Sequence, residues 1–276
     1  MTSPPENTEY VLGYSDDEHA RLDVQALLLE PATRWALEKV SVKAGWRCLD
    51  VACGTGSVTR ILGDLVGPNG SVHAVDLDET YGNRAIKKLE SAGSGKFSFE
   101  KLDVTAGVSP KGAPFDLVFT RLLILHMAEP LKVLKNLWSW VKPGGVLLVQ
   151  DYDMLPATTF TDGGNAEHGS LLIRKIFGAM GVDFRAGSTM PRKFLMADIG
   201  PHDGIEVSAT FVPGKDNIAR SSPVLHSLKP VALKYGLVAE GEIEVLLAAM
   251  AIEGQEPHCI GRWPDLISTW KFKPRD

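Results

Sequence analysis

The sequence predicts a doubly wound α/β domain with a mostly parallel sheet. Short apolar runs bounded by glycine alternate with amphipathic stretches of about ten to fifteen residues, which is the pattern of βαβ units. The first apolar run leads into a loop with two glycines, CGTG at 53–56. At 276 residues, the chain has room for one such domain with an added cap.

The first half of the chain supplies the regular part of the pattern. Two N-terminal helices are expected, the first over 15–30 with Ser15 and Glu18 in capping-box spacing, and the second from Pro31 to about Val40. Further helices are expected from Val58, over 79–92 and from Pro130, each with apolar residues along one face. The strands expected between them are 46–52, 71–77, 96–104, 115–121 and 146–153.

Beyond residue 154 the pattern is less regular, and it predicts a cap. We expect a polar loop over 156–166, strands at 204–212 and 266–273, and helices near 167–180, 190–198, 217–235 and 239–253. Helices between the last strands would cover the end of the sheet where open α/β folds bind ligands. The predicted division is an N-terminal helical lid at 1–40 and a domain at 41–276, with cap helices at about 156–200 and 217–255.

Charge and composition favour a small-molecule partner. A net charge of -5 and a pI near 5.8 give no field that would attract nucleic acid or an anionic membrane, so neither is expected. The opening MTSPPENTEY lacks the features of a targeting segment, and we expect a cytoplasmic protein. The oligomeric state stays open, with a homodimer as one option.

The three cysteines predict neither a disulfide framework nor a metal site. Cys48, Cys53 and Cys259 are odd in number, and only His258 lies near one of them at any ligand-like spacing. No metal is therefore expected.

Two carboxylates flank the glycine loop and constrain its ligand. Asp50 lies in the first strand, and Asp76 ends the second, where an acid accepts hydrogen bonds from ribose hydroxyls. Asp50 would repel a pyrophosphate but would favour a ligand end that carries an ammonium group. Thr59 stands where the G-x-G-x-x-G pattern has its third glycine, which also argues against a dinucleotide.

Five motifs in register resemble those of class I S-adenosylmethionine-dependent methyltransferases. They are DVACGTG (50–56), AVDLD (74–78), KLDVT (101–105), FDLVFTRLLILH (115–126) and VKPGG (141–145). The closing STWKFKP resembles the last strand of that fold, and the leader YVLGYSDDEHARLDVQ resembles a ubiquinone/menaquinone-type and natural-product tailoring subgroup. The resemblance implies a Rossmann-like seven-stranded sheet and S-adenosyl-L-methionine as cofactor.

The resemblance implies contacts for the methionine and ribose ends of that cofactor. Asp50 and the backbone of Gly54 and Gly56 would face the methionine portion. Asp76 would bind the ribose hydroxyls, and Leu77 would pack on the adenine.

Further cofactor contacts follow from the later motifs and the leader. Asp103 would accept from the adenine amino group and Val104 would meet a ring nitrogen, while Arg121 would lie beside the methionine end. Tyr14 and Gln25 would close over the cofactor. Alternatively, Asp103 caps a turn, Arg121 forms a structural ion pair, and the two leader residues lie on a helix surface.

His126 is the candidate catalytic base, because it follows the fourth strand and matches the histidine of an L-x-H signature in the subgroup. A structural, hydrogen-bonded histidine is the alternative. Asp151 and Tyr152, at the end of the fifth strand, are candidate substrate contacts, as are His168 and Arg185 in the cap. Turn formation and simple solvation are their alternatives.

The expected function is methyl transfer to a small organic molecule, in secondary metabolism. Three alternatives remain open: a cofactor-binding enzyme that cyclises or rearranges its substrate, a nicotinamide-dependent oxidoreductase, and a non-catalytic ligand-binding protein. Apolar residues of the cap would either contact a hydrophobic substrate or form its core, which we favour for most of them: Phe160, Phe177, Met180, Phe184, Met190, Phe194 and Met196.

Overall fold

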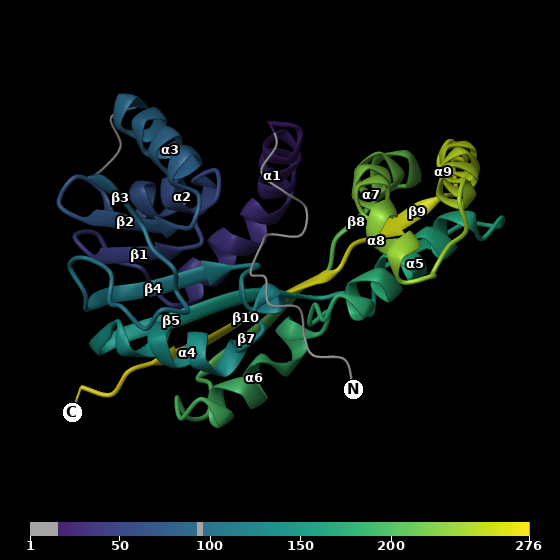
Figure 1. Cartoon of the computed structure of the whole chain (residues 1–276). Helices are drawn as coiled ribbons and strands as arrows, with labels where there is room; N and C mark the ends of the chain where they lie inside the picture. Colours follow the sequence, from purple (N-terminus) through teal and green to yellow (C-terminus); the bar gives the residue numbers. More distant parts are fainter. Residues whose placement is uncertain (1–15, 93–95, 276) are drawn as a thin grey trace.

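A seven-stranded sheet forms the centre of the molecule, in the order β3-β2-β1-β4-β5-β10-β7 (Figure 1). The computed structural model describes residues 16–92 and 96–275. Its strands are β1 (Arg47–Val51), β2 (Ser71–Asp76), β3 (Phe97–Lys101), β4 (Phe115–Arg121), β5 (Val141–Asp153), β7 (Gly204–Ser208) and β10 (Asp265–Phe272). The neighbouring strands β3, β2, β1, β4 and β5 pair in parallel, whereas β10 lies antiparallel between β5 and β7. The predicted doubly wound, mostly parallel sheet is therefore confirmed.

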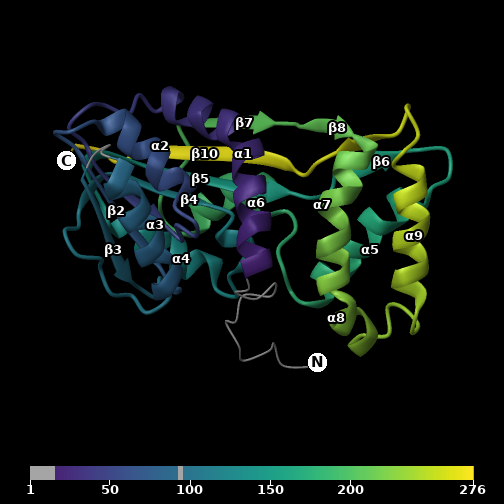
Figure 2. The ribbon, with the colours of Figure 1, turned by 90° about the horizontal axis from the view of Figure 1, so that it is seen from above.

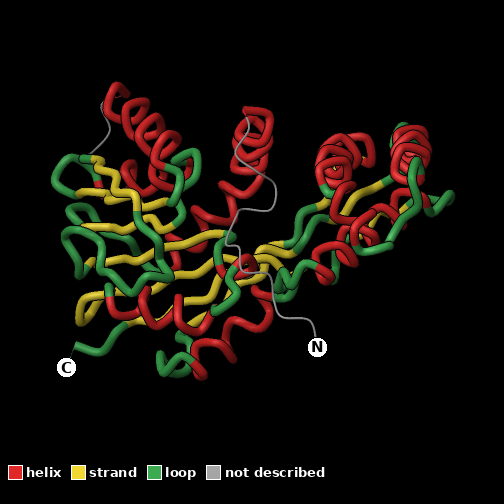
Figure 3. Tube along the Cα trace, viewed as in Figure 1, coloured by secondary structure: helices red, strands yellow, loops and turns green. Residues whose placement is uncertain are grey.

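Helices cover both faces of this sheet, as the red and yellow layers of Figure 3 show. They are α1 (Asp16–Lys39), α2 (Ser57–Val66) and α3 (Glu79–Ala92) on one face, and α4 (Pro130–Ser139) and α6 (Ala186–Met196) on the other. Leu37 and Ile61 are buried against the first face, and Leu134 and Phe194 against the second. Burial of each such side chain contributes about 1.5–3 kcal/mol.

The strand order reverses between β1 and β4, which lie side by side although β2 and β3 separate them in sequence. In open α/β sheets the ligand binds at the carboxyl ends of the strands that flank such a reversal. The fold therefore places a ligand-binding site at the loops after β1 and β4.

The N-terminal region differs from the prediction, because a single helix replaces the two expected ones. α1 runs from Asp16 to Lys39 with Pro31 inside it. Proline removes one helical hydrogen bond but accepts helical φ, so a helix held by tertiary contacts can continue through it. Leu29, Ala36 and Leu37 supply those contacts, since all three are buried.

The cap contains a second sheet that the sequence did not predict. Three short strands pair in the order β6-β9-β8: β6 (Thr158–Phe160), β9 (Ile260–Arg262) and β8 (Phe211–Pro213). The loop expected at 156–166 therefore contains β6, and the strand expected at 204–212 is divided into β7 of the main sheet and β8 of the second sheet. Strands of three residues are too short for a periodic pattern, and their pairing partners lie about 50 to 100 positions apart in the sequence.

Four helices complete the cap: α5 (Asn165–Ala179), α7 (Gly214–Ser227), α8 (Lys229–Lys234) and α9 (Glu242–Glu253). They stand beside the end of the main sheet, and β5 and β10 run toward them (Figures 1 and 2). The cap and the sheet share one apolar cluster, which includes Leu29 of α1, Leu125, Tyr152 and Leu266. α6, which was expected in the cap, packs instead against the main sheet. The limits given for the lid and the domain remain predictions.

The expected core role of the apolar cap residues is confirmed for most of them. Phe177, Met190 and Phe194 are buried, and Met180 and Phe184 are partly buried. Phe160 and Met196 are exposed.

None of the helices in residues 16–92 and 96–275 combines the length and the apolar character that a membrane span needs.

Candidate functional site

The loop after β1 turns the chain sharply into α2. Ala52, Gly54 and Gly56 have positive φ values of 58°, 51° and 78°, in the left-handed region that glycine tolerates best. A Cβ on Gly56 would also lie 2.9 Å from the Cβ of Ala85, so this position has no room for a side chain. The loop therefore exposes backbone at the start of α2, where unpaired N–H groups favour a negatively charged ligand group.

Asp76 holds this loop from the end of β2. One carboxylate oxygen, Oδ2, accepts a hydrogen bond from the Gly54 N–H at 2.9 Å, and Oδ1 accepts one from the Asp78 N–H at 3.0 Å. Each oxygen has a second lone pair for a ligand hydroxyl. The neighbouring Leu77 is 44% exposed, which leaves an apolar surface beside the carboxylate.

Asp50 is buried next to the start of α2, and Thr59 binds it. The Thr59 Oγ1 hydroxyl donates to Asp50 Oδ2 at 2.6 Å. Burial raises the pKa of Asp50 to about 7, against the Thr59 hydrogen bonds and the positive charge of Arg121, which favour the ionised form. The residue that replaces the third glycine is therefore the hydrogen-bond partner of the first acid.

Arg121, at the end of β4, reaches toward two helices. Its Nη1 donates to Thr33 Oγ1 of α1 and its Nη2 to Ser57 Oγ of α2, both at 2.9 Å. Burial lowers the pKa of Arg121, and the charge of Asp50 opposes that shift. Within the described residues no ion pair joins the two groups, so their charges lie near each other without neutralising each other directly.

A buried chain of polar side chains continues from Arg121 across the sheet. Thr33 Oγ1 donates to Gln150 Oε1 at 2.8 Å, and Gln150 Nε2 donates to Ser268 Oγ at 2.8 Å. Sequence reasoning missed Thr33, Ser57 and Gln150. The available signal was a polar residue within an apolar stretch, such as Gln150 in VLLVQD, because a buried polar group needs a partner.

Asp103 and Val104 follow β3 at the same edge of the sheet. Asp103 is exposed, and its Oδ1 accepts from the backbone N–H of Thr105 at 2.8 Å and from its hydroxyl at 2.7 Å. One oxygen of Asp103 therefore caps a turn, as the alternative interpretation predicts. Val104 is buried, and its carbonyl accepts a hydrogen bond from Asn136 Nδ2 at 2.8 Å.

His126 lies in a short 3-10 turn, η1 (Ile124–His126), that Asp151 holds from β5. Asp151 is fully buried, and its oxygens accept from the backbone N–H groups of Leu125 at 3.1 Å and Tyr152 at 2.9 Å. Burial raises the pKa of Asp151 to about 7, although these backbone bonds and the charge of Lys193 favour ionisation. The structure thus gives Asp151 a supporting place behind the turn of His126.

Gln25 of the leader contacts Tyr152. Gln25 Nε2 of α1 donates to the Tyr152 hydroxyl at 3.0 Å, so α1 reaches the end of β5. Tyr14 lies outside the described residues.

The two cap candidates take different places. Arg185 is exposed just before α6, in a segment anchored to the turn of His126 by the bond from Asp183 N–H to the Leu125 carbonyl at 3.0 Å. His168 is exposed on the first turns of α5, where Glu253 of α9 binds the N-terminal amides. The structure thus brings Arg185 near the other candidates and places His168 apart from them in the cap.

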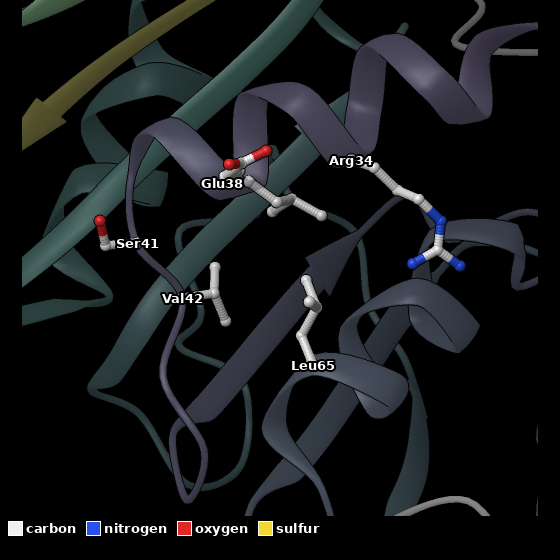
Figure 4. Close-up of a pocket in the computed structure, with 6 residues that line it drawn as sticks. Arg34, Glu38, Ser41, Val42 and Leu65 are labelled. Atoms are coloured by element: carbon white, nitrogen blue, oxygen red, sulfur yellow. The ribbon is translucent and has the colours of Figure 1, made fainter.

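No cluster of metal-ligating side chains occurs among the described residues. A surface pocket of about 480 Å³ lies between α1 and α2, as Figure 4 shows, and it contains none of the candidate residues. Its lining residues are Arg34, Leu37, Glu38, Ser41, Val42 and Leu65.

Comparison with known protein families identifies the part of the chain that holds this site. The family described as "Methyltransferase domain" matches residues 42–176, which include β1 to β5 and their loops. The chain carries a methyltransferase domain. The predicted resemblance to S-adenosylmethionine-dependent methyltransferases is thereby confirmed for this part of the chain.

Sequence relatives of the methyltransferase domain differ in what they act on. Phosphoethanolamine N-methyltransferase 1 of Arabidopsis thaliana is 31% identical over 128 residues, which are 46% of this chain and 25% of the relative. A ubiquinone/menaquinone biosynthesis C-methyltransferase of Pseudomonas fluorescens is 33% identical over 120 residues, 43% of this chain and 46% of the relative. The match thus covers a quarter to under half of these relatives' length.

Solved structures share the fold over most of this chain. A crystal structure from Bacillus halodurans C-125 has a TM-score of 0.59 at 16% identity and covers 87% of this chain and 98% of that one. Phosphoethanolamine N-methyltransferase 2 of Haemonchus contortus, in complex with phosphomonomethylethanolamine and S-adenosylhomocysteine, has a TM-score of 0.54 at 16% identity over 88% of this chain and 52% of that one. The likeness extends beyond residues 42–176 into the cap.

Proposed function

We propose that the protein is an S-adenosylmethionine-dependent methyltransferase that acts on a small organic molecule, an intermediate of secondary metabolism. The observation that carries the proposal is the arrangement of three charged side chains around the glycine loop. Asp50 lies in β1, one residue before its end, Arg121 ends the adjacent β4, and Asp76 ends β2 on the other side.

These three groups fit the polar parts of an amino-acid nucleoside. Asp50 suits an ammonium group, and Arg121, with the N-terminus of α2, suits a carboxylate. Asp76 has acceptor capacity for two ribose hydroxyls, and the exposed Leu77 offers an apolar face to a purine. Asp103 and Val104 follow the next strand, where the far edge of that base would lie.

The same arrangement opposes the oxidoreductase alternative. A dinucleotide would bring a pyrophosphate to the glycine loop, beside the buried Asp50, where two like charges would repel each other. Thr59 also occupies the helix position that a dinucleotide loop gives to glycine.

The chemistry asks little of the protein beyond alignment. When bound, the cofactor supplies a methyl group on a sulfonium, which is already electrophilic. The residues at the ends of β4 and β5 then hold the acceptor in line and exclude water, and His126 can take its proton. Tyr152 and Arg185 are the contacts proposed for the acceptor, with Gln25 and Tyr14 closing from the leader. Asp151 supports the turn that carries His126. His168 is proposed to contact a part of the acceptor farther from the methyl group.

Two further parts of the proposal have separate support. The sequence relatives are named for small-molecule substrates, which favours a small acceptor here. All three cysteines are buried and unpaired, which favours a reducing compartment such as the cytoplasm.

Calorimetry tests the cofactor assignment. The protein should bind S-adenosylhomocysteine, and Asp76→Ala should abolish that binding because the ribose acceptor and the Gly54 anchor are lost together. Asp76→Asn keeps one acceptor oxygen and should retain weaker binding, while Asp162→Ala, an exposed change in the cap, serves as control. Equal affinity in Asp76→Ala, or tighter binding of a nicotinamide dinucleotide, would overturn the proposal.

Product mass separates methyl transfer from the remaining alternatives. Incubation with the cofactor and candidate acceptors should give a product that is heavier than the acceptor by one methylene unit. An unchanged mass with a changed product indicates cyclisation or rearrangement, and binding without any product indicates a non-catalytic protein.

A further inference from the structure

Thr59 is a fully buried polar side chain at the start of α2, and it contacts the acid of the preceding strand. Its hydroxyl donates to Asp50 Oδ2 at 2.6 Å, and its backbone N–H also stabilises that carboxylate. Both donors come from the first turn of α2, where backbone N–H groups lack helical partners. Thr59 thus holds Asp50 through two donors from one residue.

Few other groups help to keep Asp50 ionised. Burial opposes its charge most strongly, and the negative charge of Asp76 on β2 opposes it further. Arg121 on β4 favours the ionised form, and the buried Cys53 of the loop lies near enough for Asp50 to raise the pKa of its thiol. The hydroxyl of Thr59 is therefore one of the main supports for a carboxylate in a poor environment for charge.

We propose that Thr59 is a positioning residue, which directs one oxygen of Asp50 into α2 and keeps the carboxylate charged so that the other can bind the ammonium end of the cofactor. This rests on the proposed function. It also gives the residue in place of the third glycine a specific role, because Thr59 selects a ligand with a positive end, which a glycine at the same place would not do.

The binding of S-adenosylhomocysteine as a function of pH tests the role of Thr59. In the wild type, affinity should rise with pH as Asp50 ionises and fall again at higher pH, where the α-ammonium group of the ligand loses its proton. Thr59→Val keeps the shape and removes the donor, so the rising limb should move to higher pH and affinity at pH 6 should drop roughly tenfold. The falling limb belongs to the ligand and should stay in place.

Five further variants isolate the contact. Thr59→Ser keeps the hydroxyl and should restore the wild-type profile, while Thr59→Ala serves if Thr59→Val does not fold. Asp50→Asn should remove the rising limb, and Thr59→Val should then cause no further shift in that background. Thr269→Val is the matched control, because Thr269 is also fully buried but its hydroxyl has no partner among the described residues.

An unshifted rising limb in Thr59→Val, or the same loss of affinity in the Asp50→Asn background, would overturn the role of Thr59. Failure of the wild type to bind at any pH would instead overturn the proposed function. In that case, titration of the ¹³C-labelled Asp50 carboxyl in the ligand-free protein still reads the contact: Thr59→Val should raise its pKa, and an unchanged value contradicts the inference.

Discussion

Two buried aspartates, one near the end of β1 and one near the end of β5, occupy similar environments and are held in different ways. Burial raises the pKa of both Asp50 and Asp151 to about 7. The hydroxyl of Thr59 binds Asp50, which also lies near the positive Arg121. Backbone amides of Leu125 and Tyr152 bind Asp151.

The number of residues that hold each acid distinguishes a ligand site from a structural support. Backbone amides need their acceptor wherever they are buried, so Asp151 has both oxygens committed to the shape of a turn. Asp50 is held by the hydroxyl and the backbone N–H of one residue, Thr59, and lies near a cation with which it forms no ion pair among the described residues. Burial and a raised pKa therefore do not by themselves identify a functional acid.

The largest expected effect concerns the turn that Asp151 supports. His126→Ala should lower kcat by roughly 10²–10⁴-fold if His126 is the general base, with the affinity for S-adenosylhomocysteine unchanged. Steady-state kinetics and calorimetry measure the two quantities, and His258→Ala, an exposed histidine of the cap, is the control. A kcat within a few-fold of wild type would leave the turn with a structural role only.

Removal of each aspartate should separate stability from binding. Asp151→Ala leaves buried amides without an acceptor and should lower the free energy of unfolding by about 3 kcal/mol, which urea denaturation measures. Asp50→Ala should cost less stability but should remove ligand binding. Equal losses of stability in the two variants would show that the comparison is wrong.

The pH dependence of stability should depend on Asp50 in the ligand-free protein. A carboxyl whose pKa rises from 3.8 to about 7 on folding adds stability below its unfolded pKa, and this contribution is lost as pH rises through about 7. Asp50→Asn removes that loss, so its unfolding free energy relative to wild type should grow by about 2–3 kcal/mol between pH 5 and pH 8. Parallel stability curves across this range would contradict the assignment.

The smallest expected effect lies in the polar chain that connects the two regions. Thr33→Val removes the hydroxyl that Gln150 accepts from and Arg121 donates to, and it should cost about 1–2 kcal/mol of stability. The freed Arg121 should also bind the ligand carboxylate less well, by a few-fold in calorimetry. Thr269→Val again controls for the change of a buried threonine, and equal behaviour of the two variants would exclude a role for the chain.

Local pattern was enough to predict the main sheet and the helices on it. The helix expected over 79–92 is α3 with the same bounds, and the strand expected over 115–121 is β4. These elements are long and have one apolar face, so their periodicity is visible in the sequence. Asp50 and Asp76 were found for a related reason, since strand order alone brings strand ends together.

The parts that could not be predicted depend on contacts distant in sequence. The strands of the second sheet have three residues each, and Gly261 of β9 has no side chain because Asn217 of α7 occupies that space. The partner of Asp50 was treated as a missing glycine, although Thr59 is the residue that binds it. Hydrogen bonds between distant side chains leave no periodic trace, so a buried hydroxyl cannot be assigned its acceptor from one sequence.

The backbone at the ends of β1 and β4 has a consequence for engineering the protein. Ala52 follows β1 and Leu122 follows β4, with φ values of 58° and 57°, and side chains there cost about 1–2 kcal/mol relative to a relaxed conformation. Such strain persists only where the surrounding contacts enforce it. Leu122 also packs on the apolar cluster of the cap, and glycine there would lose that contact. Glycine in place of Ala52 would relax the folded backbone at a smaller loss, so a thermostable variant should be sought first at that junction, with the geometry of the loop as the property most at risk.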